Sequence, residues 1–177
     1  PEVMQAVLDL GADIINDIRA LREPGAMDVV ARHPACGICL MHMHRDPQSM
    51  QLAPMEGDVV PVVRDFLASA AAQAVSRGVS AARIVLDPGI GFGKTVEQNL
   101  ELIDRLGAIK ALGYPLLVGP SRKSFIGYTL NLPLEERLEG TAAAVALCID
   151  RGADIIRVHD VGVMTRVARM TDAIVRR

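Results

Sequence analysis

Cysteine is scarce in this 177-residue chain, whose three cysteines form an odd number that disulfides cannot fully pair. Cys36 and Cys39 form a CxxC pair, but no second pair follows that would complete a zinc site. We interpret the cysteines as reduced packing residues of a cytoplasmic protein, with a redox role of the CxxC pair as the alternative.

Blocks of like charge and long apolar runs are also missing. The formal net charge is -2, and no basic face or Lys/Arg block favours nucleic acid or an anionic membrane as a partner. No stretch reaches the roughly 18 apolar residues of a membrane span, and the first residues, PEVMQAVLDLG, lack the basic start of a signal peptide. With 50% hydrophobic residues, the sequence predicts a single domain over 1–177 with a well-filled core.

Neither common nucleotide motif is present in residues 84–95, IVLDPGIGFGKT, although their glycine-rich end suggests a phosphate loop. A P-loop that ends in this GKT needs a glycine where Pro88 stands. The dinucleotide pattern fails as well, because Lys94 or Val96 occupies the position of its last glycine. We predict a strand, a glycine-rich loop and a helix, with Asp87 at the carboxyl end of the strand.

Short β-like runs alternate with longer helical patterns along the chain. The predicted strands cover 13–18, 37–43, 84–87, 115–119 and 155–159. Helical spacing of apolar residues covers 59–77, 96–112, 134–151 and 161–175, with a shorter helix after Gly25 and another at the start, where Pro1 lies in the first turn. This alternation predicts an α/β fold in which helices cover parallel strands.

Two features favour a (β/α)8 TIM barrel over an open doubly wound sheet. The sequence GADII occurs at 11–15 and again at 152–156, so one βα unit is reused. Each predicted strand also ends in polar or reactive residues, where a barrel assembles its active site; these are Asn16 and Asp17, His42 and His44, Asp87, Ser121 to Lys123, and Arg157 with His159. A complete barrel takes about 250 residues, so we expect an incomplete barrel with about its last five βα units, lacking N-terminal strands.

Five motifs in order resemble the dihydropteroate synthase family, over essentially the whole chain. They are GADIINDIRAL (11–21), LMHM (40–43), LDPGIGFGKT (86–95), SRKSFIG (121–127) and RVHDV (157–161). The resemblance implies a pterin-binding TIM barrel and a transferase that forms a carbon–nitrogen bond. Such an enzyme condenses p-aminobenzoate with 6-hydroxymethyl-7,8-dihydropterin pyrophosphate, giving 7,8-dihydropteroate and pyrophosphate in folate biosynthesis, and is the target of sulfonamides.

The resemblance also implies parts that this sequence does not contain. Family members carry an NVTPDSFSDGG-like loop and a DTxKP motif before the matched region, and the loop provides the ligand for the Mg2+ cofactor. We therefore expect no metal ligand among these residues, about 90 to 110 further residues upstream at barrel spacing, and no turnover by the 177 residues alone. The resemblance further implies a homodimer with small-molecule substrates.

Site residues follow from the resemblance by position. The pterin is expected to contact Asn16, Ile18, Met41, Asp87, Phe92, Gly119 and Lys123. Arg122 and Ser124 are expected on the p-aminobenzoate side, and Arg157 with His159 at the pyrophosphate. The catalytic residues implied are Lys123, Arg157 and His159.

Structural alternatives exist for several of these residues. Asp87 and Asn16 are also typical of turns at strand ends. Arg157 lies in the otherwise apolar run IIRVH, where a buried guanidinium needs an anion. Because Arg157 and His159 are two residues apart, they share one strand face and form a fork suited to pyrophosphate; the alternative is an ion pair of Arg157 with Asp160 or Asp17.

Histidines suggest a further alternative, since His42 and His44 also share a strand face and could bind a metal. No carboxylate is spaced to complete such a site, so we do not favour it. The segment HRDP at 44–47 stands where the family pattern QGxP is expected, which leaves the contribution of this loop open.

Two other functional classes remain open. Methyltransferases that use methyltetrahydrofolate share the barrel and the Asn/Asp recognition of the pterin, but lack the SRKS and RVHDV pair. The non-enzymatic alternative is a chain that only binds a pterin.

Overall fold

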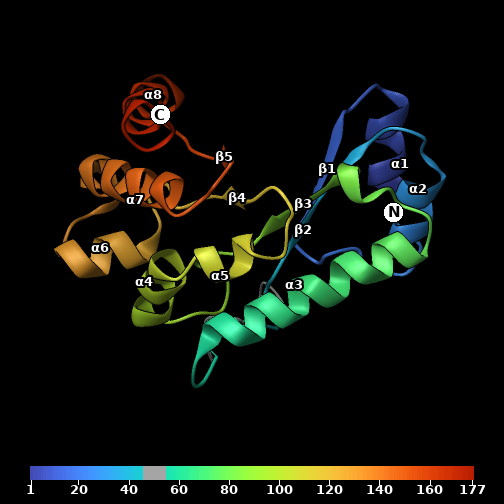
Figure 1. The fold of residues 1–177 in the computed structure, drawn as a ribbon, viewed down its shortest axis with the longest axis horizontal. Helices are drawn as coiled ribbons and strands as arrows, with labels where there is room; N and C mark the ends of the chain where they lie inside the picture. Colours follow the sequence, from blue (N-terminus) through green and yellow to red (C-terminus); the bar gives the residue numbers. More distant parts are fainter. Residues whose placement is uncertain (46–54) are drawn as a thin grey trace.

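The computed structural model describes residues 1–45 and 55–177 (Figure 1). Its strands are β1 (Ile14–Asp17), β2 (Gly37–Met41), β3 (Ile84–Asp87), β4 (Leu117–Val118) and β5 (Ile155–Ile156). Its helices are α1 (Glu2–Asp9), α2 (Ala26–Arg32), α3 (Val59–Ser76), α4 (Val96–Asp104), α5 (Gly107–Lys110), α6 (Ser124–Leu130), α7 (Leu138–Asp150) and α8 (Val161–Val175), with short 3-10 helices η1 (Ala81–Arg83) and η2 (Leu134–Glu136).

All described strands run parallel and follow one another in chain order. β1, β2 and β3 form one sheet, β4 pairs with β5, and a parallel bridge between Leu86 and Leu116 joins the two groups. A doubly wound sheet would reverse its strand order at a switch point, and no reversal occurs among the described strands. The prediction of part of a (β/α)8 barrel is confirmed.

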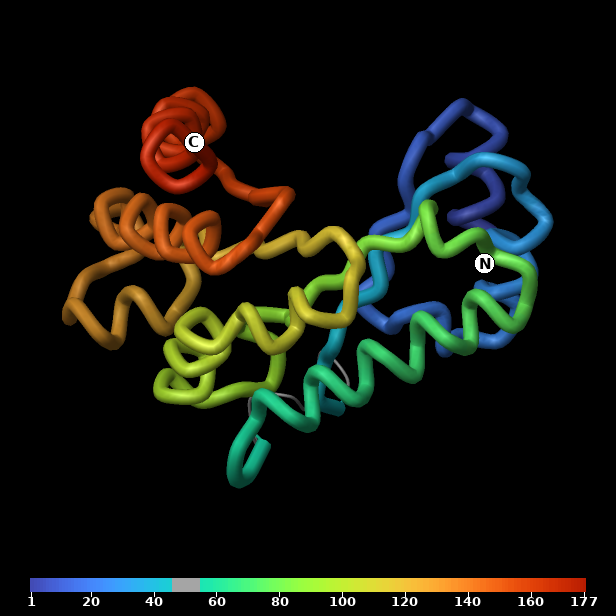
Figure 2. The backbone as a smooth tube through the Cα atoms, in the orientation of Figure 1, coloured from blue at the N-terminus to red at the C-terminus, as the bar shows by residue number. Residues whose placement is uncertain are grey.

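The helices pack on one face of this curved sheet. Strand residues of alternate positions, such as Ile38, Leu40 and Leu86, join helix residues such as Leu67 and Leu102 in the main hydrophobic core. Alternation directs the other positions to the opposite face, which in a barrel is the interior. Figure 2 shows α1 and α2 at one end of the chain's path and α7 and α8 at the other.

The outer strands leave apolar side chains in water. β1 pairs only with β2 and β5 only with β4 among the described strands. Ile14 is 55% exposed and Ile155 is 37% exposed. Unpaired strand edges of this kind promote association of chains.

Helix α3 begins at an N-cap, Asp58, whose carboxylate accepts a hydrogen bond from the amide of Val60 at 3.0 Å. By length and composition alone, α3 is the one described helix that could cross a membrane, although it contains Arg64 and Asp65. Its buried residues, which include Leu67, fill the core against the strands, as in the core helix of a barrel.

Several element boundaries differ from the prediction. The helix expected over 96–112 breaks after Asp104 and resumes at Gly107, a residue with low helix propensity, and the turn buries both Leu106 and Ile109. Helix α6 was not predicted, because it is short and follows directly on the SRK loop.

The region 134–151, expected as one helix, begins as the 3-10 turn η2 and becomes helical at Leu138. The strands β2 and β5 end at Met41 and Ile156, earlier than expected, because each pairs with a neighbouring strand that ends at the same level, β3 at Asp87 and β4 at Val118.

Candidate active site

The candidate site lies at the carboxyl ends of the strands, which parallel pairing brings to one edge. In the register of the sheet, Met41 pairs with Asp87, and Asn16 pairs with Cys39, two residues before Met41 on β2. Met41 and Cys39 are buried but absent from the helix-side core. Alternation therefore directs Asn16, Met41 and Asp87 to the interior face of the barrel.

Asp87 ends β3 and is 6% exposed. Its Oδ1 accepts a hydrogen bond from the amide of Gly89 at 2.7 Å, so the turn role proposed as an alternative is real. No described residue donates a hydrogen bond to its Oδ2. Burial raises the pKa of Asp87 above its ordinary value, and the hydrogen bond from Gly89 and the nearby cations Lys123, Lys94 and Arg157 oppose the shift.

The loop after Asp87 depends on glycine at two positions. Gly89 has φ +68°, and a Cβ there would lie 1.9 Å from the carbonyl oxygen of His42. Gly91 has φ +81°, and a Cβ there would lie 2.8 Å from Cδ of Lys123. The amide of Gly91 donates to Oδ1 of Asn99 at 2.6 Å. The loop can therefore pass close to β2 and to the Lys123 side chain only because these residues lack a side chain.

Lys123 precedes α6 and reaches back across this loop. Its ammonium donates a hydrogen bond to the carbonyl of Ile90 and lies 4.5 Å from the ring centroid of Phe92, within cation–π range. Burial, with a contribution from Arg157, lowers the pKa of Lys123 to about 8, and Asp87 opposes this shift. The structure thus brings together the predicted residues Asp87, Phe92 and Lys123.

Sequence reasoning missed Lys94, a 6% exposed lysine in the same loop. Its Nζ lies 3.0 Å from Nδ1 of His42 and donates to the carbonyls of Gly89 and Phe92 at 2.9 and 3.1 Å. The available signal was the position of Lys94 directly after a run of glycine and apolar residues. Lysine is rarely fully buried, so its residue type alone did not predict this burial.

His159 is held by Ser121, which follows β4 and is buried. The Ser121 hydroxyl accepts from the backbone amide of His159 at 3.1 Å and lies 2.9 Å from Nδ1 of its ring. Between Arg157 and His159, Val158 packs against the hydrophobic cluster of α7 and α8.

The sequence predicted that Arg157 is buried, and this prediction was wrong. β5 ends at Ile156 and Arg157 is exposed, so its guanidinium does not need an anion to offset burial. No ion pair links Arg157 to a residue that the structure describes, and the alternative partners are engaged elsewhere. Asp17 accepts the amides of Arg19 and Leu21 at 3.1 and 2.6 Å.

The other alternative partner, Asp160, binds Arg122. Two hydrogen bonds of 2.9 and 2.6 Å join the guanidinium to the carboxylate, and they hold the pKa of Asp160 below its usual range. Arg122 has φ +55°, its amide donates to Oγ1 of Thr141, and its carbonyl accepts from Arg137 at 3.0 Å. Arg122 therefore ties the loop after β4 to the loop after β5.

The remaining predicted residues lie around this group. Ile18 is half-buried after β1, and Asn16 is exposed on β1 with no hydrogen bond to Asp87 or Lys123 in the described structure. The backbone of Gly119 lies against Arg157, since a Cβ there would be 3.6 Å from its carbonyl oxygen. Ser124 is exposed as the first residue of α6.

A metal at the histidine pair finds no support in the geometry. Nδ1 of His42 faces Lys94, and Nε2 of His44 accepts from Arg45 at 3.3 Å. Across residues 1–45 and 55–177, no group of three or more His, Cys, Asp and Glu side chains could hold a metal ion. Of the HRDP segment, residues 46 and 47 lie outside the described residues.

The cysteines of the CxxC pair are both buried and unpaired. Burial raises the pKa of the Cys39 thiol, and the Asp87 carboxylate raises it further. Sγ of Cys36 accepts from Arg83 at 3.2 Å. Burial of both side chains agrees with the packing role that the sequence predicts.

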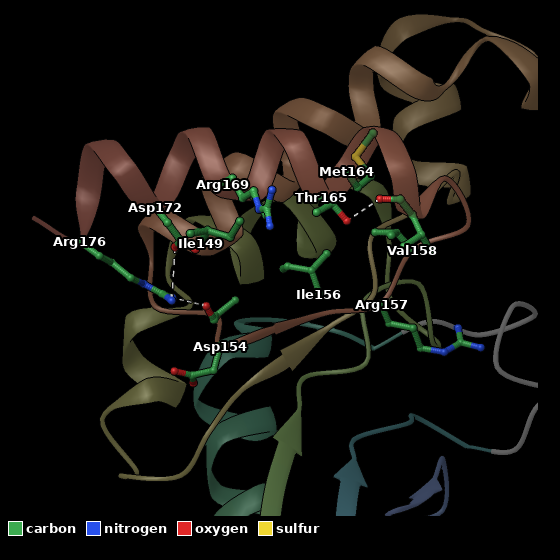
Figure 3. A pocket seen from close by; sticks show the side chains of 13 residues that line it. Ile149, Asp154, Ile156, Arg157, Val158, Met164, Thr165, Arg169, Asp172 and Arg176 are labelled. Carbon is green, nitrogen blue, oxygen red and sulfur yellow. Dashed lines mark hydrogen bonds and ion pairs between the residues drawn. The ribbon is translucent and has the colours of Figure 1, made fainter.

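A pocket of about 450 Å3 runs between β5 and α8 (Figure 3). Asp154 and Arg176 lie at one end, and Arg157 extends away from α8 at the other. This pocket follows the open edge of β5 and shares only Arg157 with the candidate site.

Strand order and the cluster of Asp87, Lys123 and Arg157 define a barrel protein whose candidate site lies at the carboxyl ends of the strands. Residues 1–159 match the family model described as "Pterin binding enzyme". The chain belongs to this family of pterin-binding enzymes.

Similar proteins carry a more specific name. A dihydropteroate synthase of Synechocystis is 47% identical over 177 residues, which cover 99% of this chain and 61% of the relative. Solved structures include the Yersinia pestis dihydropteroate synthase with a sulfonamide drug (TM-score 0.94, 37% identity, 98% of this chain and 63% of that one). Another is the Xanthomonas albilineans enzyme with 4-aminobenzoic acid (TM-score 0.89, 40% identity, 98% and 62%). The chain thus spans about three fifths of the length of these relatives.

Proposed function

We propose that this chain carries the pterin and pyrophosphate sites of a dihydropteroate synthase. The observation that carries the proposal is the convergence of Asp87, Lys123 and Arg157 at one strand edge, each within electrostatic reach of the others. The Asp87 carboxylate suits the donor-rich edge of a pterin, and the Lys123 ammonium suits its ring carbonyl and ring nitrogen. The exposed Arg157 guanidinium suits the pyrophosphate. The names of the similar proteins support the same activity.

The pterin is proposed to lie between Asp87 and Lys123. Oδ2 of Asp87 would accept from the donor-rich amino-pyrimidine edge, and Asn16 on the same face would both donate and accept. Lys123 would donate to the ring carbonyl and ring nitrogen. Met41 and Phe92 would form apolar walls, with Ile18 and Gly119 at the margin.

Pyrophosphate is proposed to leave toward Arg157 and His159. The amine of p-aminobenzoate attacks the methylene carbon of the pterin substrate, the bond from this carbon to the pyrophosphate oxygen breaks, and the amine loses one proton. Arg157 and His159 stabilise the charge that grows on the leaving group. Arg122 and Ser124 are proposed on the p-aminobenzoate side, with Arg122 oriented by Asp160.

Mg2+ is proposed as a cofactor on resemblance alone. The described residues offer no cluster of ligands for it, and we assign it no step. We also propose a cytoplasmic homodimer. An apolar groove of about 230 Å3 between α4, α6 and α7, lined by the exposed residues Leu100, Leu130 and Leu147, supports a contact between copies.

The experiment uses the full-length gene product that contains this chain, with the pterin pyrophosphate and p-aminobenzoate as substrates. Dihydropteroate and pyrophosphate should form in equal amounts. Asp87→Asn should lower kcat/KM by roughly 10- to 100-fold, since a hydrogen bond to a charged group contributes about 1.5–3 kcal/mol. Asp65→Asn, on the exposed face of α3 beside Arg64, should have no effect. A folded protein that binds pterin but forms no dihydropteroate would leave only the binding role.

A further inference from the structure

Lys94 has no role in the reaction described above, yet it is the most deeply buried lysine of the chain. The sequence contains three lysines, at 94, 110 and 123. Lys110 forms a partly exposed ion pair with Asp154 at 2.6 Å, and Lys123 faces the pterin site. Among the described residues, Lys94 has no carboxylate within ion-pair distance and has three neutral acceptors instead.

These three acceptors belong to two separate parts of the site. Nδ1 of His42 comes from the end of β2, and the carbonyls of Gly89 and Phe92 come from the loop after β3. In its protonated form Lys94 carries three N–H groups, so it can donate one to each acceptor. Burial lowers the pKa of Lys94 to about 7, with Lys123 contributing and Asp87 opposing the shift. Lys94 therefore cross-links the end of β2 to the glycine-rich loop.

His42 is a well-fixed anchor for this cross-link. Its ring packs edge-on against Phe66 with centroids 5.0 Å apart, and the Arg22 guanidinium lies 5.2 Å from the centroid of the same Phe66 ring. Burial, with Lys94, His44 and Arg22 nearby, lowers the pKa of His42 to about 3. His42 is therefore neutral at physiological pH, and its Nδ1 can accept the hydrogen bond from Lys94.

Both carbonyls that Lys94 holds belong to residues next to ligand-binding groups. The amide of Gly89 fixes Oδ1 of Asp87, and the ring of Phe92 lies under the ammonium of Lys123. A shift of either residue would change the distance between the Asp87 carboxylate and the Lys123 ammonium. Binding sites lose affinity when supporting contacts are loosened by about 1 Å.

We propose that Lys94 is a positioning residue of the pterin site, which sets the spacing of Asp87 and Lys123 by fixing the glycine-rich loop to His42. The identity of the ligand in this inference rests on the proposed function. The contacts do not, because they link residues of the chain itself. The class of ligand affected is the pterin, not the p-aminobenzoate or the pyrophosphate.

The test compares Lys94→Met with Lys110→Met in the full-length gene product. Methionine keeps the length and apolar stem of lysine but donates no hydrogen bond. We expect Lys94→Met to raise KM for the pterin pyrophosphate, and the Kd of 6-hydroxymethylpterin, by about tenfold, the effect of losing roughly 1.4 kcal/mol. KM for p-aminobenzoate should stay within about twofold, and Lys110→Met should resemble wild type in every measurement.

A second measurement separates this inference from the proposed function. Hydrogen–deuterium exchange of the peptide containing residues 88–94 should be faster in Lys94→Met than in Lys110→Met, whether or not a substrate binds. Unchanged exchange, or an equal change of KM for both substrates in a folded variant, would overturn the positioning role. If wild type neither binds pterin nor turns over while exchange responds as expected, the proposed function fails and the loop contact stands without its ligand.

One rescue experiment guards against a variant that merely misfolds. Lys94→Ala leaves room near His42 that a small alkylammonium ion can enter. Ethylammonium should restore pterin affinity, and ethanol at the same concentration should not, because it carries too few donors. Equal rescue by both compounds would indicate filled volume alone and would contradict the hydrogen-bond role.

Discussion

Replacing Gly89 with alanine should damage both stability and pterin binding, because this residue meets two separate obstacles. Its backbone has φ +68°, a conformation that residues with a Cβ rarely adopt. The added Cβ would also lie 1.9 Å from the carbonyl oxygen of His42 and 3.4 Å from Nζ of Lys94. The first of these contacts involves backbone, so no side-chain rotation relieves it.

The size of the effect follows from the two costs. A left-handed backbone costs a residue with a Cβ about 1–2 kcal/mol, and an overpacked contact in a buried site costs typically about 1–3 kcal/mol. We therefore expect the free energy of unfolding to fall by about 2–5 kcal/mol for Gly89→Ala. At about 2–4 °C per kcal/mol for a chain of this size, Tm should fall by roughly 4–20 °C.

Gly78→Ala is the matched control. Gly78 has φ +91°, but no atom lies within 4 Å of the position its Cβ would take. It should therefore lose only the backbone cost of about 1–2 kcal/mol. Urea unfolding of both variants measures the difference, and pterin titration should show weaker binding for Gly89→Ala alone, since its amide holds Asp87. Equal destabilisation of the two variants would refute the proposed contact between the loop and β2.

Two further predictions concern the charged residues of the site. Lys123 has its pKa lowered to about 8, and only the ammonium form donates fully to the pterin. Pterin affinity should hence be constant below pH 8 and fall about tenfold per pH unit above it; Lys123→Arg, which keeps its charge, should lose this dependence, and a slope that persists in that variant would exclude Lys123 as its source. Arg157→Ala should raise KM for the pterin pyrophosphate by at least about tenfold and leave KM for p-aminobenzoate nearly unchanged. Equal effects on both substrates would contradict the pyrophosphate role.

Local sequence signals predicted some elements to the residue and failed for others. β3 was predicted with its observed limits, Ile84–Asp87, since an apolar run is followed directly by Pro88, which cannot donate a ladder hydrogen bond. β5 was predicted to reach His159 but ends at Ile156, because strand length depends on pairing with distant segments. The break between α4 and α5 depends on which side chains the core accepts, which the helical period alone does not contain.

Sequence signals likewise identified some residues of the candidate site and missed others. The motifs identified Asp87, Phe92 and Lys123, which the fold brings together. The burial of Lys94 was not predictable from periodicity, since it depends on where the end of β2 lies relative to the loop. The predicted burial of Arg157 was wrong because β5 ends one residue before it, at Ile156.

The contacts of the glycine-rich loop differ from those of a phosphate loop. In a phosphate loop, backbone amides and a lysine point outward at the anion. Here the amide of Gly89 donates to Asp87, the amide of Gly91 donates to Asn99, and the ammonium of Lys94 donates to two loop carbonyls. These donors are directed at the chain's own acceptors, so the Asp87 carboxylate is the group that the loop offers to a ligand in the proposed function. A carboxylate is suited to the donor edge of a heterocycle, and the proposal therefore assigns the anionic part of the substrate to the exposed guanidinium of Arg157.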